Sequence, residues 1–198
     1  MRLAVKPYRG LEVVIPKRFP RKQIPLILQQ HEVWITTQLE KHLRLDRTVS
    51  LPESINLALS EVDYDVVYRK AGPSGLQEHG NVLTISYDTE QMALDVLRKW
   101  IRQSARKVLM PLLRQTADEF GFEYVTCSIR TQKSRWGSCS SRGTISLNDQ
   151  LIFMPAATVR YLMIHELCHT RHMNHAQSFW SLVEKCCEDY RQHEKILS

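Results

Sequence analysis

Four of the eight histidines in this 198-residue chain lie in the eleven residues from His165 to His175. His165 and His169 are four residues apart, so on a helix their side chains lie on one face, one turn apart. Two imidazoles in this arrangement can bind one metal ion at the Zn–N distance of about 2.0–2.1 Å. Glu166 projects about 100° around the same helix, which places its carboxylate beside such an ion as a general base. The segment therefore favours folds in which an HExxH helix holds both histidines toward one point.

The helix that carries this pair is expected to be largely enclosed by the protein. Pro155 suits its first turn, where the missing N–H costs nothing. Apolar residues then follow at Val159, Met163, Ile164 and Leu167. Polar groups buried without partners in such a helix cost free energy, and a metal ion would supply those partners. The same cost disfavours the alternative, in which the histidines are surface residues without a ligand.

A catalytic zinc site needs a third protein ligand and an open fourth position. His175 can be that ligand if the chain turns back near Asn174, a residue type that tolerates the left-handed conformation such a turn needs. Glu184 or Glu188 would instead complete the two-His, one-Glu set of thermolysin-type enzymes. His172 is the last alternative, although three successive turns of one straight helix do not easily surround one ion. The residues themselves leave these alternatives open.

The periodicity of apolar residues along the chain predicts an α+β protein. Extended segments are expected at residues 3–5, 11–15, 55–69, 82–87, 122–130 and 144–148, with a turn at 8–10. Helices are expected at residues 23–45, 90–119 (broken or kinked near Pro111 and ended by Gly121), from Pro155, and 176–195. Loops are expected at residues 71–80 and 134–143. This order predicts a small, mostly antiparallel β-containing lobe over residues 1–89, packed against a helical core over residues 90–198, the two forming one domain.

The composition fits a single folded domain with reduced cysteines. Hydrophobic residues make up 43% and charged residues 24% of the chain, which favours a buried core over disorder. The five cysteines are odd in number and form no CxxC pair, so no disulfide framework is expected. The N-terminus lacks the apolar region of a secretory signal, and no apolar run approaches the ~20 residues of a membrane span. We therefore expect a cytoplasmic protein without membrane contact.

The net charge of +6 is concentrated in the first quarter of the chain. Residues 1–50 carry ten Lys and Arg against four Asp and Glu, and the remaining residues are balanced. A basic surface attracts nucleic acid, nucleotides or acidic proteins, although a solvated basic face without a partner is the more common case. The sequence thus predicts nucleic-acid or nucleotide binding by the N-terminal quarter only as a minor alternative.

Two segments resemble a known protein family. They are SRWGSCSSRGTISLN at residues 134–148 and MIHELCHTRHMNHAQSFW at residues 163–180, and a helix start at Pro155 accompanies them. Together they are similar to the YgjP-like metallopeptidase family, which resembles the SprT-like zinc proteases within the zincin group. The resemblance covers most of the chain and is strongest from residue 130 to residue 180.

This resemblance implies a zincin-like core and one zinc ion per chain. The family pattern places the zinc on His165, His169 and His175, with Glu166 as the catalytic residue. The sequence departs little from the pattern, residues 71–81 being a candidate local insertion. The expected substrate is a protein or peptide.

The metzincins share the spacing HExxH-x5-H but are excluded by two other residues. Metzincins have Gly at the position of His172, and they need a methionine turn downstream of the histidines. Met173 is the last methionine of this chain, so no such turn is present.

Four further residues are candidate contacts for the substrate or the transition state: Arg135, Trp136, Tyr161 and His172. Arg135 could stabilise a developing oxyanion. Tyr161 is expected on the metal side of its helix, where it could donate a hydrogen bond. Structural roles are the alternative, because the RWGSC segment could be a turn that covers the metal helix and a tyrosine in a helix often only packs.

Three functions are compatible with these residues. The first is zinc-dependent peptide hydrolysis, in which Glu166 accepts the proton of a zinc-bound water that attacks the carbonyl carbon. The second is hydrolysis of nucleoside triphosphates, a label that some members of the resembled family carry, although no Gly-rich phosphate loop is visible. The third is a DNA-associated module whose structural zinc would need Cys139 as a fourth ligand.

Overall fold

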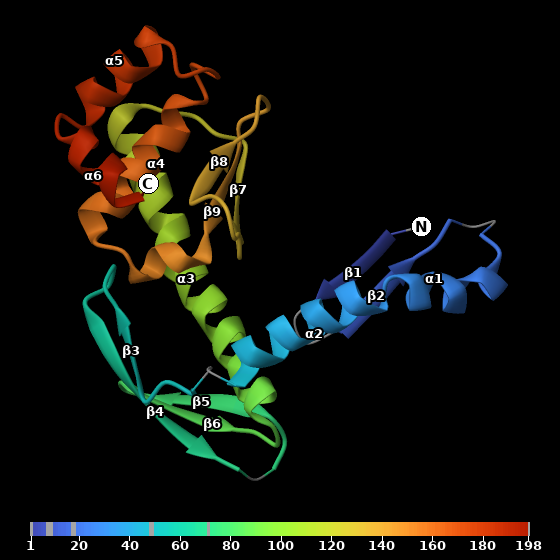
Figure 1. The fold of residues 1–198 in the computed structure, drawn as a ribbon. Coiled ribbons are helices and arrows are strands. Elements are labelled where there is room, and N and C mark those ends of the chain that lie inside the picture. The colour runs from blue at the N-terminus through green and yellow to red at the C-terminus, as the bar shows by residue number, and fades with distance from the viewer. Residues whose placement is uncertain (1, 7–9, 17–18, 48–49, 71, 198) are drawn as a thin grey trace. The chain divides into compact units, whose positions relative to one another are not determined.

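The computed structural model describes residues 2–6, 10–16, 19–47, 50–70 and 72–197 (Figure 1). Contacts within the chain divide it into two compact units, Met1–Leu51 and Pro52–Ser198. The division into residues 1–89 and 90–198 that the sequence suggested stays a prediction. No helix in the described part of the chain is long and apolar enough to cross a membrane.

The first unit contains a hairpin followed by helices. Its elements are β1 (Arg2–Lys6), β2 (Gly10–Val14), the 3-10 turn η1 (Arg21–Gln23), α1 (Ile24–Gln30) and α2 (Glu32–Arg47). The two strands, predicted as extended segments at residues 3–5 and 11–15, pair antiparallel, while most of the turn predicted at residues 8–10 lies outside the described residues. The single helix predicted at residues 23–45 is wrong, because the chain is interrupted at His31 between α1 and α2. The apolar spacing continues across this break and could not reveal it.

The basic character of this unit rests on side chains that are mostly outside the described part of the structure. Among the Lys and Arg residues of positions 1–50, only the side chain of Lys22 is described, and it is exposed. The predicted binding of nucleic acid or nucleotides therefore gains no support and stays a prediction.

The second unit begins with a four-stranded sheet in the order β3-β4-β6-β5. Its strands are β3 (Ser54–Leu57), β4 (Val62–Arg69), β5 (Gly75–His79) and β6 (Val82–Ser86). The β4–β6 pair is parallel and the other two pairs are antiparallel, so the sheet is mixed. The continuous strand predicted at residues 55–69 is broken by a turn in which Glu61 has a positive φ of 53°.

Strand β5 corrects the loop predicted over residues 71–80. Three of its five residues are exposed, and the other two are only partly buried, because the strand lies at the edge of the sheet. An edge strand of this kind needs no apolar alternation, so the polar sequence of the segment suggested a loop. Gly80, with a φ of 56°, forms the tight turn into β6.

Helix α3 (Glu90–Phe120) confirms the long helix predicted at residues 90–119. Thr89 caps its N-terminus by accepting a hydrogen bond from the Met92 N–H at 3.3 Å. Gly121 ends it in the left-handed conformation, with a φ of 65°, and the helix continues through Pro111. One face is buried, and it is formed by Ala93, Leu97, Trp100, Ala105, Leu109, Leu113, Thr116 and Ala117.

A second, three-stranded sheet follows α3, in the order β7-β9-β8. Its strands are β7 (Thr126–Arg130), β8 (Gly137–Cys139) and β9 (Thr144–Asn148), with β7 parallel and β8 antiparallel to β9. The loop predicted at residues 134–143 is thus wrong in its centre, where β8 forms the edge of this sheet. Within residues 1–89 the described strand pairs β1–β2, β3–β4 and β5–β6 are antiparallel and only β4–β6 is parallel, so the expectation of a mostly antiparallel lobe is confirmed. The α+β class is confirmed.

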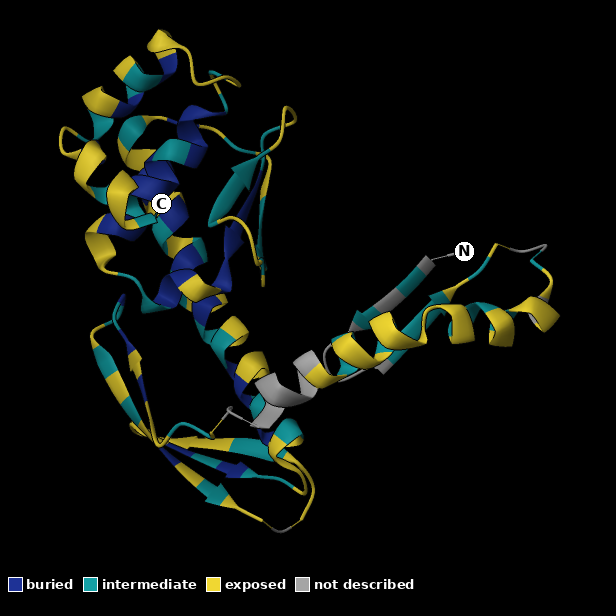
Figure 2. Cartoon of the chain, in the orientation of Figure 1, coloured by how far each residue is buried: buried dark blue, intermediate teal, exposed yellow. Residues whose placement is uncertain are grey.

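The C-terminal helices surround α4 (Ala156–Cys168), which is buried along nearly its whole length (Figure 2). It contacts α3, β8, α5 (Gln177–Cys186) and α6 (Tyr190–Leu197). The 3-10 turn η2 (Asp149–Phe153) leads into it. The last helix was predicted as one piece over residues 176–195, but the chain becomes extended at Cys187 and separates α5 from α6. Because α4 is enclosed from several sides, any polar group on it needs a partner inside the protein.

Candidate metal centre

His165 lies on the last turn of α4, and His169 is the residue that caps the C-terminus of this helix. His169 is 8% exposed and His165 is partly buried. Their ring centroids are 4.9 Å apart, so the i, i+4 spacing has placed the two imidazoles side by side.

His175 joins this pair because the chain turns back directly after α4. The His172 N–H donates to the Cys168 carbonyl oxygen at 2.9 Å, which closes the end of the helix. The Nε2 atoms of His175 and His165 then lie 3.2 Å apart. One nitrogen from each of the three rings lies within 4.8 Å of the others. The structure therefore brings together the three histidines of the family pattern.

His172 contributes through its backbone instead of its ring. Its carbonyl oxygen lies 2.9 Å from Nδ1 of His169. A carbonyl only accepts hydrogen bonds, so Nδ1 must carry the hydrogen, and Nε2 of His169 is left with its lone pair. The His172 ring lies near Ser178 Oγ, at 3.4 Å, and is not a member of the three-histidine group.

Burial and the neighbouring rings favour the neutral form of the His165 and His169 imidazoles. Burial, with the neighbouring rings of His169 and His175 acting in the same direction, lowers the pKa of His165 to about 4. The pKa of His169 is also lowered, mainly by burial. Neutral imidazole is the form that binds a metal, so at pH 7 the site does not need to lose these protons before binding.

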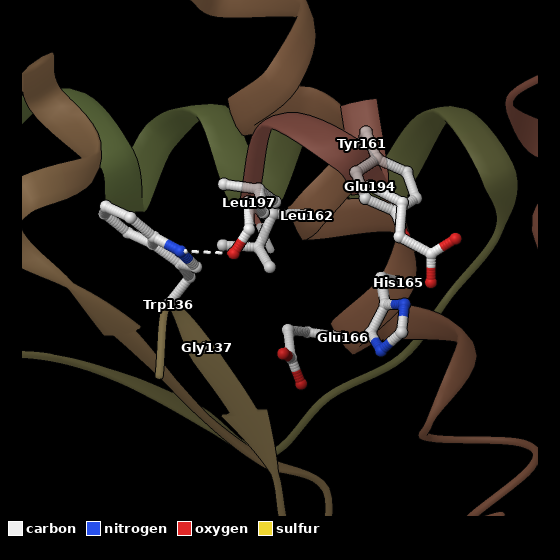
Figure 3. A pocket seen from close by; sticks show the side chains of 8 residues that line it. All are labelled: Trp136, Gly137, Tyr161, Leu162, His165, Glu166, Glu194 and Leu197. Carbon is white, nitrogen blue, oxygen red and sulfur yellow. Dashed lines mark hydrogen bonds between the residues drawn. The ribbon is translucent and has the colours of Figure 1, made fainter. Parts of the chain in front are cut away.

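Glu166 is a buried carboxylate near His165 (Figure 3). It is 5% exposed, and burial raises its pKa to about 7, with Arg135 acting in the opposite direction. Its Oε2 atom is buried and has no hydrogen-bond partner among the described residues. A buried carboxyl group of this kind is costly unless a ligand or substrate engages it, which is typical of a functional site.

Gly137 of β8 allows the backbone to pass next to this carboxylate. A Cβ atom at this position would lie 2.6 Å from Glu166 Oε1 and 2.9 Å from its Cδ and Cγ atoms. Sequence reasoning did not single out Gly137, although it lies inside the RWGSC segment. The signal was present, because a glycine within a strand often marks the close approach of another group.

A cavity of about 210 Å³ opens in front of Glu166 (Figure 3). Its wall includes His165, Trp136, Tyr161 and Glu194. The Trp136 indole N–H donates to the Leu197 carbonyl oxygen at 2.9 Å, which ties the RWGSC segment to α6.

Tyr161 and Arg135 are the other two predicted contacts. Tyr161 is 3% exposed, and its ring lies 6.0 Å from that of His165 and 6.5 Å from that of Tyr190. Burial raises the pKa of its hydroxyl, so the hydroxyl stays protonated. Arg135 is exposed, and its charge reaches Glu166.

The other predicted ligands do not join the three histidines. Glu184 and Glu188 are exposed, on and just after α5. Burial raises the pKa of the Cys139 thiol to about 11, and its sulfur lies 3.5 Å from the Ser140 carbonyl oxygen. None of the three belongs to a group of converging ligand atoms among the described residues.

A second group of ligand-type side chains comes from the segment after α5 and from α6: Cys187, Asp189 and His193. The Cys187 thiol donates to Asp189 Oδ1 at 3.2 Å, and His193 Nε2 lies 3.3 Å from Asp189 Oδ2. The other ring nitrogen of His193 lies 3.3 Å from Thr158 Oγ1. Hydrogen bonds within the group therefore account for its closeness.

The three-histidine group fits a zinc ion. Two neutral ring nitrogens at 3.2 Å repel unless a proton or a cation lies between them. Nδ1 of His165 is buried without a hydrogen-bond partner among the described residues, as is Oε2 of Glu166. Three imidazoles are a known ligand set of catalytic zinc, which keeps a fourth position open.

Comparison with known proteins gives one match over the full length of the chain. The sequence model of a family described as YgjP-like, metallopeptidase domain, matches residues 1–198. No curated protein matches the sequence.

Two solved structures overlap less than half of the chain. The metallopeptidase zymogen of Pyrococcus abyssi abylysin is 28% identical and aligns over 45% of this chain and 90% of its own, with a TM-score of 0.41. The metallopeptidase zymogen of Methanocaldococcus jannaschii jannalysin is 17% identical and aligns over 44% and 94%, with a TM-score of 0.38. Because both TM-scores are below 0.5, neither structure adds to what the family match shows.

Proposed function

Because the chain belongs to the family of YgjP-like metallopeptidase domains, we propose that it is a zinc-dependent peptidase with its metal on His165, His169 and His175. Glu166 is the general base of this proposal. The observation that carries it is the convergence of three imidazoles beside a buried carboxylate whose Oε2 atom has no partner among the described residues. The expected stoichiometry is one ion per chain.

The zinc ion, when bound, would supply Lewis acidity, which lowers the pKa of a coordinated water to about 7 and polarises the substrate carbonyl. The chain positions the histidine ligands before the zinc ion binds. The His172 carbonyl oxygen fixes the tautomer and the ring orientation of His169. The turn after α4 presents His175 to His165, so the histidine rings need little rearrangement.

Glu166 moves the proton. It accepts a proton from the attacking water and later gives it to the amine that leaves when the peptide bond breaks. Burial raises its pKa to about 7, so near neutral pH it can both take and return that proton. The close backbone at Gly137 fixes the carboxylate on the side of the cavity.

Arg135, Trp136 and Tyr161 orient the substrate in this proposal. Trp136 and Tyr161 form apolar walls of the cavity, and the Trp136–Leu197 hydrogen bond holds the first of these walls in place. The positive charge of Arg135 acts to lower the pKa of Glu166. The same charge would stabilise negative charge that develops on the substrate. Hydrolysis of nucleotides and a structural zinc module remain predictions that no observation here favours.

The Glu166→Gln variant tests the general base. The amide keeps the size of the side chain but cannot accept the proton, so peptide turnover should fall by about 10²–10⁴-fold. Zinc content, measured by elemental analysis, should stay at that of the wild type. Wild-type turnover by the variant would contradict the role of Glu166, and loss of zinc would show that this carboxylate is a ligand.

A further inference from the structure

A second cavity, of about 410 Å³, shares Trp136 and Leu197 with the first cavity. We infer that this second cavity is a subsite for a carboxylate of the peptide substrate. The carboxylate comes from an Asp or Glu side chain or from the C-terminus of the peptide. The inference rests on the proposed peptidase function, and it specifies which kind of peptide such a peptidase would prefer.

The charge of the cavity wall supports a carboxylate. The described residues that line the cavity include the cations Lys133 and Arg135 and no Asp or Glu. Arginine presents its donors as a planar fork that matches the two oxygens of a carboxylate, and lysine adds a point charge. Both side chains are exposed and can reach a ligand.

Asn148 organises the loop that carries these cations. It is 4% exposed, and its side-chain amide donates to the carbonyl oxygens of Gln132 and Arg135, both at 2.9 Å. Its backbone N–H donates to the Trp136 carbonyl oxygen at 2.8 Å. Three backbone acceptors, which would repel a carboxylate, are therefore occupied by Asn148. The loop is held in place before the substrate arrives, which lowers the cost of binding.

The two cavities differ in the kind of ionisable side chains that line them. The first is lined by Glu166 and Glu194 and the second by Lys133 and Arg135. Figure 3 shows Trp136 and Leu197 at one side of the first cavity and His165 and Glu194 at the other. A peptide whose scissile bond lies at Glu166 would therefore place a neighbouring acidic group beyond Trp136. Because the carboxylate is remote from the reacting bond, the selectivity is expected in KM more than in kcat.

Matched fluorogenic peptides test the inference. One series carries Glu, Gln or Lys at successive positions on each side of the scissile bond, and a second series differs only in a free or amidated C-terminus. We expect about tenfold higher kcat/KM for the acidic member at one position, since charge-assisted bonds are stronger than neutral ones. An effect confined to the second series identifies the C-terminal carboxylate as the source. Equal kcat/KM for acidic and neutral members everywhere would overturn the inference.

Substitution of Lys133 assigns the preference to this cavity. Lys133→Met should reduce the tenfold preference to about twofold or less, and Lys133→Glu should favour the Lys peptide. Lys107→Glu is the matched control, because Lys107 is exposed on α3 and lines neither cavity. An unchanged preference in a folded Lys133→Glu variant, with its melting temperature as the check on folding, would also overturn the inference.

Equilibrium binding separates this inference from the proposed function. The dissociation constants of the Glu and Gln peptides are measured by fluorescence anisotropy with the zinc-loaded Glu166→Gln variant, which does not need to turn over. If the wild type cleaves no peptide but the Glu peptide binds about tenfold tighter, the peptidase proposal fails and the subsite stands. If the wild type cleaves peptides and the variant binds both peptides equally, the subsite fails and the peptidase proposal stands.

Discussion

Two groups of metal-ligand side chains are built around α4, and they differ in whether their polar atoms have partners. In the group of His165, His169 and His175, two ring nitrogens face each other at 3.2 Å. Nδ1 of His165 is also buried without a partner among the described residues. This first group is held together by α4 and the turn after it, and no side chain of the group engages the buried Nδ1 of His165.

The group of Cys187, Asp189 and His193 is satisfied internally. Asp189 accepts from the Cys187 thiol and lies within reach of His193, whose other nitrogen contacts Thr158. The comparison teaches that closeness of ligand-type residues is not enough to indicate a metal site. Polar atoms that are buried and lack a protein partner are the better indication, because burying them without a partner lowers the stability of the fold.

Removing one ligand from each group should give the largest difference between them. His169→Ala leaves two imidazoles, so zinc should fall from about one ion per chain to near zero after dialysis, with peptide turnover below detection. Cys187→Ser should leave zinc content and turnover within about twofold of the wild type, because its thiol is engaged by Asp189. Elemental analysis and a peptide assay measure both. Loss of zinc from Cys187→Ser alone would reverse the comparison.

A smaller effect is expected when the backbone approach to Glu166 is blocked. In Gly137→Ala the new Cβ would lie 2.6 Å from Glu166 Oε1, so the carboxylate must move. Turnover should fall by about 10–100-fold, since such displacements are costly to positioned catalytic groups. Gly75→Ala is the matched control, because its nearest atom would be 4.0 Å away. Equal activities of the two variants would show that the position of Glu166 does not depend on Gly137.

The pH dependence of stability in the metal-free protein should also separate Glu166 from its neighbours. Burial raises the pKa of Glu166 from 4.5 to about 7, so its contribution to stability is complete below pH 4.5 and is lost as the pH rises through 7. The pKa of His165 is lowered from 6.5 to about 4, so its contribution is complete above pH 6.5 and is lost as the pH falls through 4. Between pH 4.5 and 6.5 these two contributions oppose each other.

The Glu166→Gln variant removes the contribution of Glu166 and leaves that of His165. Its effect is the smallest of the three predicted in this comparison. In the variant the free energy of unfolding should rise by about 2–3 kcal/mol between pH 4.5 and 6.5, while the wild type changes little. The lowered pKa of exposed Asp189 acts equally in both proteins and cancels in their difference. Urea unfolding in the presence of a chelator measures both curves. Parallel curves would contradict the burial of an uncompensated carboxyl group at this position.

The elements that sequence analysis predicted well are those with strong local signals. Helix α3 has a threonine cap, a repeating apolar face and Gly121 at its end, and its bounds match the prediction closely. Elements without such signals were missed. Strand β5 is polar because it lies at a sheet edge, and β8 is three residues long within a segment rich in Ser and Gly. The break at Cys187 was hidden because the apolar stripe continues across it.

The residues of the candidate site also divide into those that have a local sequence signal and those that do not. His165, Glu166 and His169 could be found from spacing alone, and the structure adds His175 beside them. The Glu alternatives for the third ligand depended on contacts between separate helices, which spacing does not report. Gly137 and Asn148 were not singled out, because their roles depend on tertiary contacts. Gly137 of β8 lies against Glu166 of α4, and Asn148 of β9 holds the loop at Gln132 and Arg135.

The sequence by itself determined that two histidines and a glutamate share one enclosed helix, because helical geometry follows from residue spacing over a few turns. Tertiary structure alone decided how much of that helix is shielded from water, which backbone passes beside Glu166, and where Lys133 and Arg135 meet the cavity beyond Trp136. The physical reason is the separation along the chain of the residues that interact. Backbone hydrogen bonds within a helix join residues four apart, whereas burial, raised or lowered pKa values and cavity walls arise only when distant segments pack together.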